Sequence, residues 1–278
     1  MVEQTHGKLN WLEHHLPEGL LVDSTWFTEH GYSTALRSHY LSAGWLEQPV
    51  RRVYRRPRGP LAWQQLVVSL QTLLRRDLVV GGRSALEHQG YSHYLQQTTT
   101  QIYLYGPKPP PTWLKDLSAG VTFLYRNDGR LFRQERASAA PYSLEAQSAP
   151  EGASRPESIA AVPWGQWDWP MMVSRPERAI LELLDELPDH ESFHQADVLM
   201  EGLTTLSPTR MQKLLTDCHS VKVKRLFFFF ADRHQHAWLK RINRKAIDLG
   251  KGKRVLAKGG KLDTRYLITV PGDLDGVQ

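Results

Sequence analysis

Residues 24–58 read STWFTEHGYSTALRSHYLSAGWLEQPVRRVYRRPR, and this stretch decides the fold of the N-terminal part of the chain. A capping Asp or Ser precedes a short helical segment that Gly31 ends, and Ser33 caps a second helix that Gly44 closes. Two short helices joined by a tight turn containing glycine predict a helix-turn-helix. Residues 45–56 then predict a β-hairpin, which would form the wing of a winged helix-turn-helix.

The second of these helices has the polarity expected of a DNA recognition helix. Its outer face is predicted to carry short polar or cationic side chains that suit base edges in the major groove, namely Ser33, Thr34, Arg37, Ser38 and His39. The wing and the residues after it add arginines suited to phosphate clamping or minor-groove insertion, namely Arg51, Arg52, Arg55, Arg56 and Arg58. The alternative is a solvated, charged hairpin used only for protein contacts. The agreement between helix polarity and wing charge favours DNA.

The flanking segments extend the prediction to an α+β protein. Leucines at helical spacing predict a helix at 7–16, and an amphipathic pattern predicts another at 61–76. A short strand and a helix within 78–90 complete the N-terminal winged helix-turn-helix domain, which we assign to residues 1–95. Residues 96–278 are assigned to a larger, mixed α/β C-terminal domain.

The predicted C-terminal domain begins with strands and continues with helices. Turn residues separate strands expected at 98–106, 121–127 and 129–135. Helical patterns are found at 176–187, 192–203, 207–219 and 221–240, and two further strands are expected around 253–259 and 265–271. Residues 137–158 are rich in Ala, Ser and Pro and predict a flexible loop or insertion.

Composition describes an ordinary soluble chain of 278 residues, long enough for two domains. No apolar run reaches the length of a membrane span, and the N-terminus lacks the pattern of an export signal. Because the single cysteine, Cys218, fits a reducing cytosol, we expect a cytoplasmic location without membrane contact. The net charge of +6 divides into +2 for residues 1–100, −5 for 101–220 and +9 for 221–278. This distribution predicts two separate basic surfaces.

The second basic surface is a lysine- and glycine-rich segment near the C-terminus. Its spacing does not fit the phosphate-binding loop GxxxxGK[ST]. Its cations are therefore expected to contact a partner or further DNA backbone, or else to form a solvated face: Lys251, Lys253, Arg254, Lys258 and Lys261. The sequence indicates no metal site, catalytic residue or cofactor.

Three tryptophans lie close together in PWGQWDWP, residues 163–170. Trp164, Trp167 and Trp169 could form a cage around a ligand. Packing or interface anchoring is the favoured interpretation, because tryptophan supplies a large apolar surface for both roles.

Several segments together resemble AbiEi-type antitoxins. They are GYSTALRSHYLSAGWLEQPVRRVYRRP (31–57), LVVGGRSALEHQGYSHYL (78–95), SRPERAILELLDELP (174–188), CHSVKVKRLFFFFADRHQHAWL (218–239) and IDLGKGKRVLAKGGKLDTRYLITVP (247–271). The resemblance covers nearly the whole chain except the loop at 137–158. It implies the antitoxin half of a bacterial type IV toxin–antitoxin pair associated with abortive phage infection.

The resemblance also implies partners and roles. The N-terminal domain would bind inverted repeats in its own promoter and repress transcription, with Arg37 and the wing arginines as DNA contacts. The C-terminal domain would counteract a nucleotidyltransferase-like toxin. No heptad stripe offers a dimer interface, so we expect a monomer that pairs up on double-stranded DNA. Two alternatives remain, an enzyme that modifies its toxin, for example by phosphorylation, and an interaction module without DNA binding.

Overall fold

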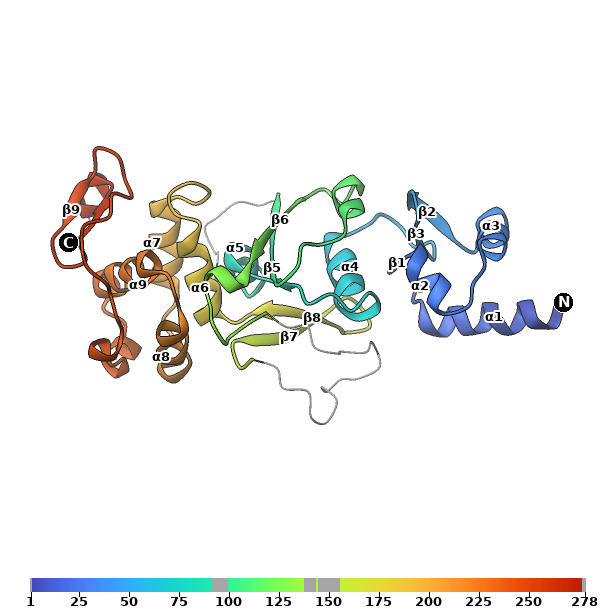
Figure 1. The fold of residues 1–278 in the computed structure, drawn as a ribbon, viewed down its shortest axis with the longest axis horizontal. Helices are drawn as coiled ribbons and strands as arrows, with labels where there is room; N and C mark the ends of the chain where they lie inside the picture. The colour runs from blue at the N-terminus through green and yellow to red at the C-terminus, as the bar shows by residue number, and fades with distance from the viewer. Residues whose placement is uncertain (1, 92–99, 138–143, 145–155, 277–278) are drawn as a thin grey trace.

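The computed structural model describes residues 2–91, 100–137, 144 and 156–276 (Figure 1). The molecule is elongated, with the N-terminal helices at one end, a sheet in the middle and the C-terminal helices at the other end. The predicted α+β class with an N-terminal winged helix-turn-helix is confirmed. The loop predicted at 137–158 lies almost wholly outside the described residues.

The N-terminal end is a winged helix-turn-helix. Its elements are α1 (Val2–His15), β1 (Leu21–Asp23), α2 (Ser24–Glu29), α3 (Thr34–Ser42), β2 (Glu47–Val50) and β3 (Val53–Arg55). The three strands form an antiparallel sheet in the order β1-β3-β2. The capping signals act as the sequence predicts, because Asp23 Oδ1 accepts hydrogen bonds from two backbone N–H groups of α2. Ser33 Oγ likewise accepts from the N–H of Leu36 in α3.

The middle of the molecule is a five-stranded mixed sheet in the order β6-β5-β4-β8-β7. Its strands are β4 (Val79–Val80), β5 (Gln101–Gly106), β6 (Thr122–Asn127), β7 (Ile159–Trp164) and β8 (Trp169–Ser174). Strands β5 and β6 run parallel, as do β4 and β8, whereas β7 and β8 form an antiparallel hairpin. The sequence did not predict this hairpin, because prolines lie within both strands, where they obscure the pattern expected of paired strands.

The strand predicted at 129–135 is wrong. Residues Asp128–Arg130 form the 3-10 helix η3, and the chain then turns inward. The neighbouring side chains of Leu131 and Phe132 are both buried, which the alternating faces of a half-exposed strand do not allow. Phe132 makes one isolated bridge to Cys218.

The segment after the wing packs between the winged helix and the sheet. It contains α4 (Trp63–Val68), the π-helical turn η1 (Ser69–Leu73), β4 and α5 (Gly82–His88). Ser69 Oγ accepts a buried hydrogen bond from the N–H of Leu21 in β1. A single hydrophobic cluster runs from the winged helix through α4 and η1 to one face of the sheet. The domain boundary predicted at residues 95 and 96 stays a prediction.

The C-terminal end is mainly helical. The predicted helices are found as α6 (Pro176–Asp185), α7 (Phe193–Gly202), α8 (Pro208–Asp217) and α9 (Val221–His234), around a second hydrophobic cluster. The elements that follow them are the 3-10 segments η4 (Ala237–Arg241), η5 (Arg244–Ala246) and η6 (Gly272–Gly276), and the strands β9 (Lys261–Asp263) and β10 (Ile268–Val270). The 3-10 segment η2 (Thr112–Asp116) lies earlier in the chain, between β5 and β6. The strand expected around 253–259 is wrong, since Arg254 makes only one bridge to Ile268 and β10 pairs with β9 instead.

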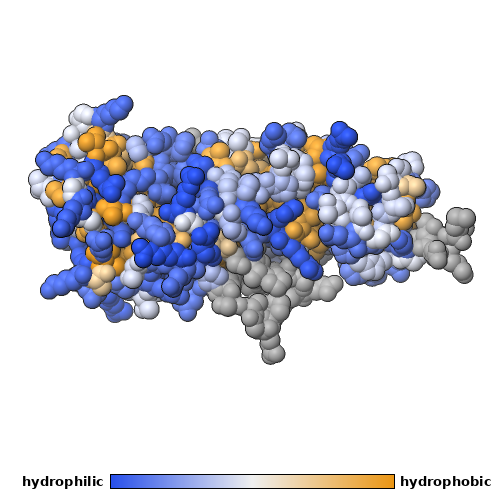
Figure 2. Space-filling model, in the orientation of Figure 1, coloured by the Kyte–Doolittle hydropathy of each residue, from blue (hydrophilic) through white to orange (hydrophobic). Residues whose placement is uncertain are grey.

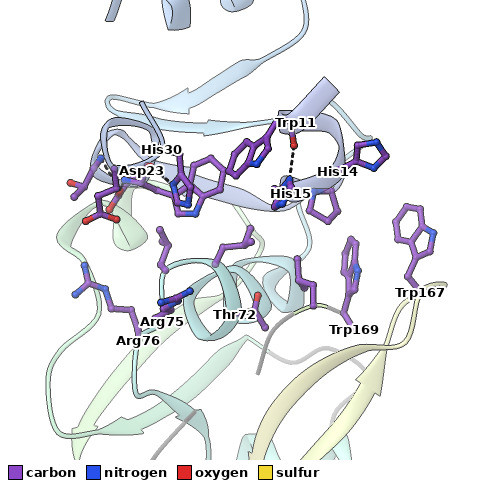
Figure 3. Close-up of a pocket in the computed structure, with 17 residues that line it drawn as sticks. Trp11, His14, His15, Asp23, His30, Thr72, Arg75, Arg76, Trp167 and Trp169 are labelled. Carbon is purple, nitrogen blue, oxygen red and sulfur yellow. Dashed lines mark hydrogen bonds between the residues drawn. The ribbon is translucent and has the colours of Figure 1, made fainter. Parts of the chain in front are cut away.

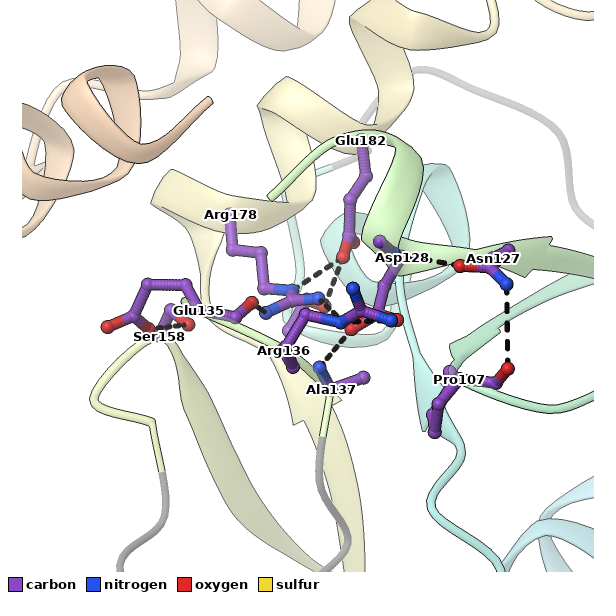
Figure 4. A network of polar contacts seen from close by, with 12 residues as sticks. Pro107, Asn127, Asp128, Glu135, Arg136, Ala137, Ser158, Arg178 and Glu182 are labelled. Carbon is purple, nitrogen blue, oxygen red and sulfur yellow. Dashed lines mark hydrogen bonds and ion pairs between the residues drawn. The ribbon is translucent and has the colours of Figure 1, made fainter. Parts of the chain in front are cut away.

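A buried polar network joins α6 to the sheet (Figure 4). The fully buried Arg178 of α6 pairs with Glu182 through Nε, 2.6 Å from Oε1, and with Asp128 at 3.6 Å. Glu182 also accepts hydrogen bonds from Ser174 Oγ of β8 and from the N–H of Gly82. Burial raises the pKa of Glu182, whereas the Arg178 charge lowers it. The polar residues of α6 thus face inward as well as its apolar ones.

Candidate nucleic-acid interface

The outer face of α3 carries small polar side chains. Thr34, Ser38 and His39 are exposed, as predicted, and Ser42 extends the same face by one turn. Tyr40 is buried and anchors the opposite face. Ala35 is exposed as well. The helix therefore presents a surface of short side chains that can approach the edges of bases closely.

Arg37 does not lie on the outer face, which corrects the sequence-based placement. Its side chain is only 8% exposed. Nη1 donates to the backbone oxygen of Ser24 at 2.8 Å, and Nη2 donates to Thr34 Oγ1 at 2.9 Å. The guanidinium also lies 5.9 Å from the centre of the Tyr54 ring. Arg37 thus connects α3 to the start of α2 and to the wing.

Two arginines occupy the tip of the wing. Arg51 and Arg52 form the turn between β2 and β3, and both are exposed. Arg52 adopts a left-handed backbone conformation with φ of 66°, as tight hairpin turns require. Among the described residues, neither guanidinium has a hydrogen-bond or ion-pair partner. Both remain available for a phosphate group.

The other three predicted contacts are held by partners inside the molecule. Arg55 pairs with Glu47 across the hairpin, with Nε 2.7 Å from Oε2. Arg56 lies 3.7 Å from Glu13 and 3.5 Å from Glu18, and it also donates to backbone oxygens at the end of α1. Arg58 pairs with Glu18 and lies 4.1 Å from the Trp167 ring centre. Composition alone could not distinguish these arginines from the two at the tip.

Trp45 is a further candidate contact, which was not among the residues predicted from the sequence. It follows Gly44 at the end of α3, leads into the wing and is 45% exposed. Its backbone N–H donates to the oxygen of Tyr40, which fixes its position relative to α3. The sequence could have predicted this contact, because a tryptophan directly follows the glycine that ends the recognition helix.

The second basic surface lies at the other end of the molecule (Figure 1), where the visible face mixes hydrophilic and hydrophobic residues (Figure 2). Five cationic residues are exposed there, as predicted: Lys251, Lys253, Arg254, Lys258 and Lys261. Val255 lies among them and is 72% exposed. The buried Arg225 donates to the backbone oxygens of Leu249 and Gly252. These hydrogen bonds hold the start of the exposed loop against α9.

Other kinds of site receive no support in the described part of the chain. In those ranges, no group of three or more His, Cys, Asp or Glu side chains is placed to hold a metal ion. Cys218 is buried, and burial raises its thiol pKa to about 11, which disfavours a reactive thiolate. A search of the same residues finds no helix with the length and apolar character needed to cross a membrane.

Sequence comparison places both parts of the chain in one family. Residues 99–271 match a family model described as "Transcriptional regulator, AbiEi antitoxin, Type IV TA system". Residues 5–97 match the model of the AbiEi antitoxin N-terminal domain. The chain belongs to the AbiEi antitoxin family. It is therefore a member of a family of transcriptional regulators from type IV toxin–antitoxin systems, which confirms the resemblance inferred from the sequence.

Structural comparison shows a similar fold in a solved protein. The crystal structure of the RV2827C protein from Mycobacterium tuberculosis is similar to this AbiEi-family chain, with a TM-score of 0.52 and 15% sequence identity. The similarity covers 94% of this chain and 88% of that one. At this identity the likeness concerns the fold alone. A search of curated proteins finds no match.

The position of Arg37 predicts a structural effect on substitution. Arg37→Ala removes the hydrogen bond that joins α3 to Ser24 of α2 and a second one to Thr34 within α3, so we expect a loss of about 1–3 kcal/mol in the free energy of unfolding. Ser38→Ala, on the exposed face of the same helix, is the matched control and should change it by less than about 0.5 kcal/mol. Urea denaturation measures both. Equal effects of the two substitutions would contradict the structural role of Arg37.

Proposed function

We propose that this AbiEi-family regulator binds double-stranded DNA of its own promoter through α3 and the tip of the wing. The observation that carries the proposal is the pair Arg51 and Arg52, exposed and unpaired among the described residues, on the hairpin that follows α3. In helix-turn-helix complexes the second helix enters the major groove. An arginine at the wing tip can then contact the phosphate backbone or the narrow minor groove.

Some of the proposed residues would contact the DNA, and the others would hold the helix and the wing in place. Thr34, Ser38 and His39 would face base edges. Ser33, at the start of the helix, would lie near the phosphate backbone of the DNA. Arg37 would support the helix from behind, because its guanidinium is already bound within the protein. Arg55, Arg56 and Arg58 would fix the wing and the segment after it in the same way.

The regulatory proposal follows from this interface and the family. Inverted repeats require one winged helix at each half-site, and we infer that two monomers pair up on the DNA and repress transcription. The basic surface around Lys251 and Lys258 would contribute to counteracting a nucleotidyltransferase-like toxin, without enzymatic activity of this chain. Both partners would be met in the cytoplasm.

A salt titration tests the DNA interface. The double variant Arg51→Ala/Arg52→Ala should bind its upstream DNA more weakly than the unaltered protein. The slope of log K against log salt concentration should fall in magnitude by about 2, since each lost phosphate contact removes about 0.9. Arg130→Ala/Arg133→Ala removes two exposed charges from the middle of the molecule and should keep affinity and slope. An unchanged slope in the wing variant would refute the proposed wing contacts.

A charge reversal separates the second surface from the first. Lys251→Glu/Lys253→Glu should weaken rescue of cells that express the toxin, because it reverses charge on the proposed partner surface. The same variant should keep its affinity for promoter DNA. Arg51→Ala/Arg52→Ala should do the opposite, and Arg130→Glu/Arg133→Glu serves as the control for rescue. Full rescue by the Lys251→Glu/Lys253→Glu variant would exclude this surface from toxin control.

A further inference from the structure

A cavity of about 900 Å³ lies between the winged helix and the central sheet (Figure 3). Helices α1 and α2 form one wall, and the opposite wall is formed by η1 and the β7–β8 hairpin. None of the described residues of α3 or of the wing lines it, so this cleft is separate from the proposed DNA interface. Its volume falls within the range of about 300–1,000 Å³ typical of small-molecule sites.

Aromatic rings cover the wall formed by α1 and α2. The rings of Trp11 and His15 stack at 4.0 Å with an angle of 8° between their planes. The rings of Trp26 and His30 lie 4.3 Å apart. Nδ1 of each histidine donates to the backbone oxygen of the tryptophan four residues earlier, at 2.8 Å for His15 and 2.7 Å for His30. The rings are therefore held in place before any ligand arrives.

The β7–β8 hairpin brings two more indole rings to the opposite wall. Trp167 and Trp169 stack with ring centres 4.9 Å apart, and Trp167 is 48% exposed. Both belong to the tryptophan-rich motif for which the sequence left open a ligand cage or a packing role. Their position at the cleft fits both roles. Trp169 is buried and packs inside the protein, whereas Trp167 stays accessible to a ligand.

Two arginines supply positive charge where η1 ends. Arg75 and Arg76 are exposed, and among the described residues neither guanidinium has a partner. Arg75 also adopts a left-handed backbone conformation with φ of 49°, which favours glycine and strains other residues. The carboxylates of Asp23 and Glu29 line the opposite wall, so an anionic group would bind on the arginine side.

We propose that this cleft binds a nucleoside phosphate. Tryptophan and histidine rings offer faces on which a planar base can stack. The two guanidinium groups present the forked donors that bind phosphate oxygens. The walls belong to the winged helix and to the sheet, so a bound nucleotide would also contact both. The site does not depend on the proposed DNA binding, and its test uses no DNA.

Isothermal titration of the full chain with ATP, GTP and inorganic triphosphate tests the proposal. At least one nucleotide should bind saturably at micromolar to millimolar concentration, and more tightly than triphosphate, because triphosphate cannot stack. Arg75→Ala/Arg76→Ala should weaken binding at least tenfold, whereas Arg130→Ala/Arg133→Ala, which removes two exposed charges away from the cleft, should not change it. Absence of saturable binding by both nucleotides, triphosphate binding as tight as theirs, or full binding by the Arg75→Ala/Arg76→Ala variant would overturn the proposal.

Arg75→Gly distinguishes a ligand contact from a structural role. Glycine relieves the left-handed backbone, so the melting temperature should stay the same or rise while nucleotide binding weakens. A lower melting temperature with unchanged nucleotide binding would show that Arg75 serves the fold alone and would overturn its assignment to the site.

Discussion

A positive charge buried at the junction of sheet and helices determines how the middle of this molecule is assembled. Arg178 is fully buried, and its partners Glu182 and Asp128 are fully buried too. A lone charge in such a place would be very costly, so its partners must be present together. Glu182 also accepts from the N–H of Gly82 and from Ser174, which ties α5, α6 and β8 to one another. The sheet and the C-terminal helices are therefore specified as one arrangement.

The winged helix is connected to this assembly by packing as well as by the chain. Its hydrophobic cluster continues through α4 and η1 onto the sheet, and the hydrogen bond from Leu21 to Ser69 crosses the same contact. Arg58, stacked on Trp167, adds a contact between the segment after the wing and the β7–β8 hairpin. The α3 face and the wing tip are thus displayed at one end of the molecule, and the aromatic cleft lies at the junction.

The sequence predicts the winged helix and most C-terminal helices because their signals are local. Caps at Asp23 and Ser33 and the glycines after them fix helix ends within a few residues. The β7–β8 hairpin was missed, because Pro163 and Pro170 lie within its two strands and because β8 also pairs with the distant β4. The sequence also could not show in which direction each side chain points. Of the five arginines between 51 and 58, three are paired, and the two at the tip have no partner in the part of the chain that the structure describes. The folded positions of Glu13, Glu18 and Glu47 decide which three are paired.

We propose that α3 and the wing tip, at one end of an elongated regulator, form the surface that binds DNA. Hydrogen–deuterium exchange of the protein, measured with and without its upstream DNA, tests this claim most directly because it locates contacts without altering any residue. Slower exchange is expected in 33–42 and 47–55 when DNA is added. Slower exchange confined to the central sheet or to the C-terminal helices, with 33–55 unchanged, would contradict it.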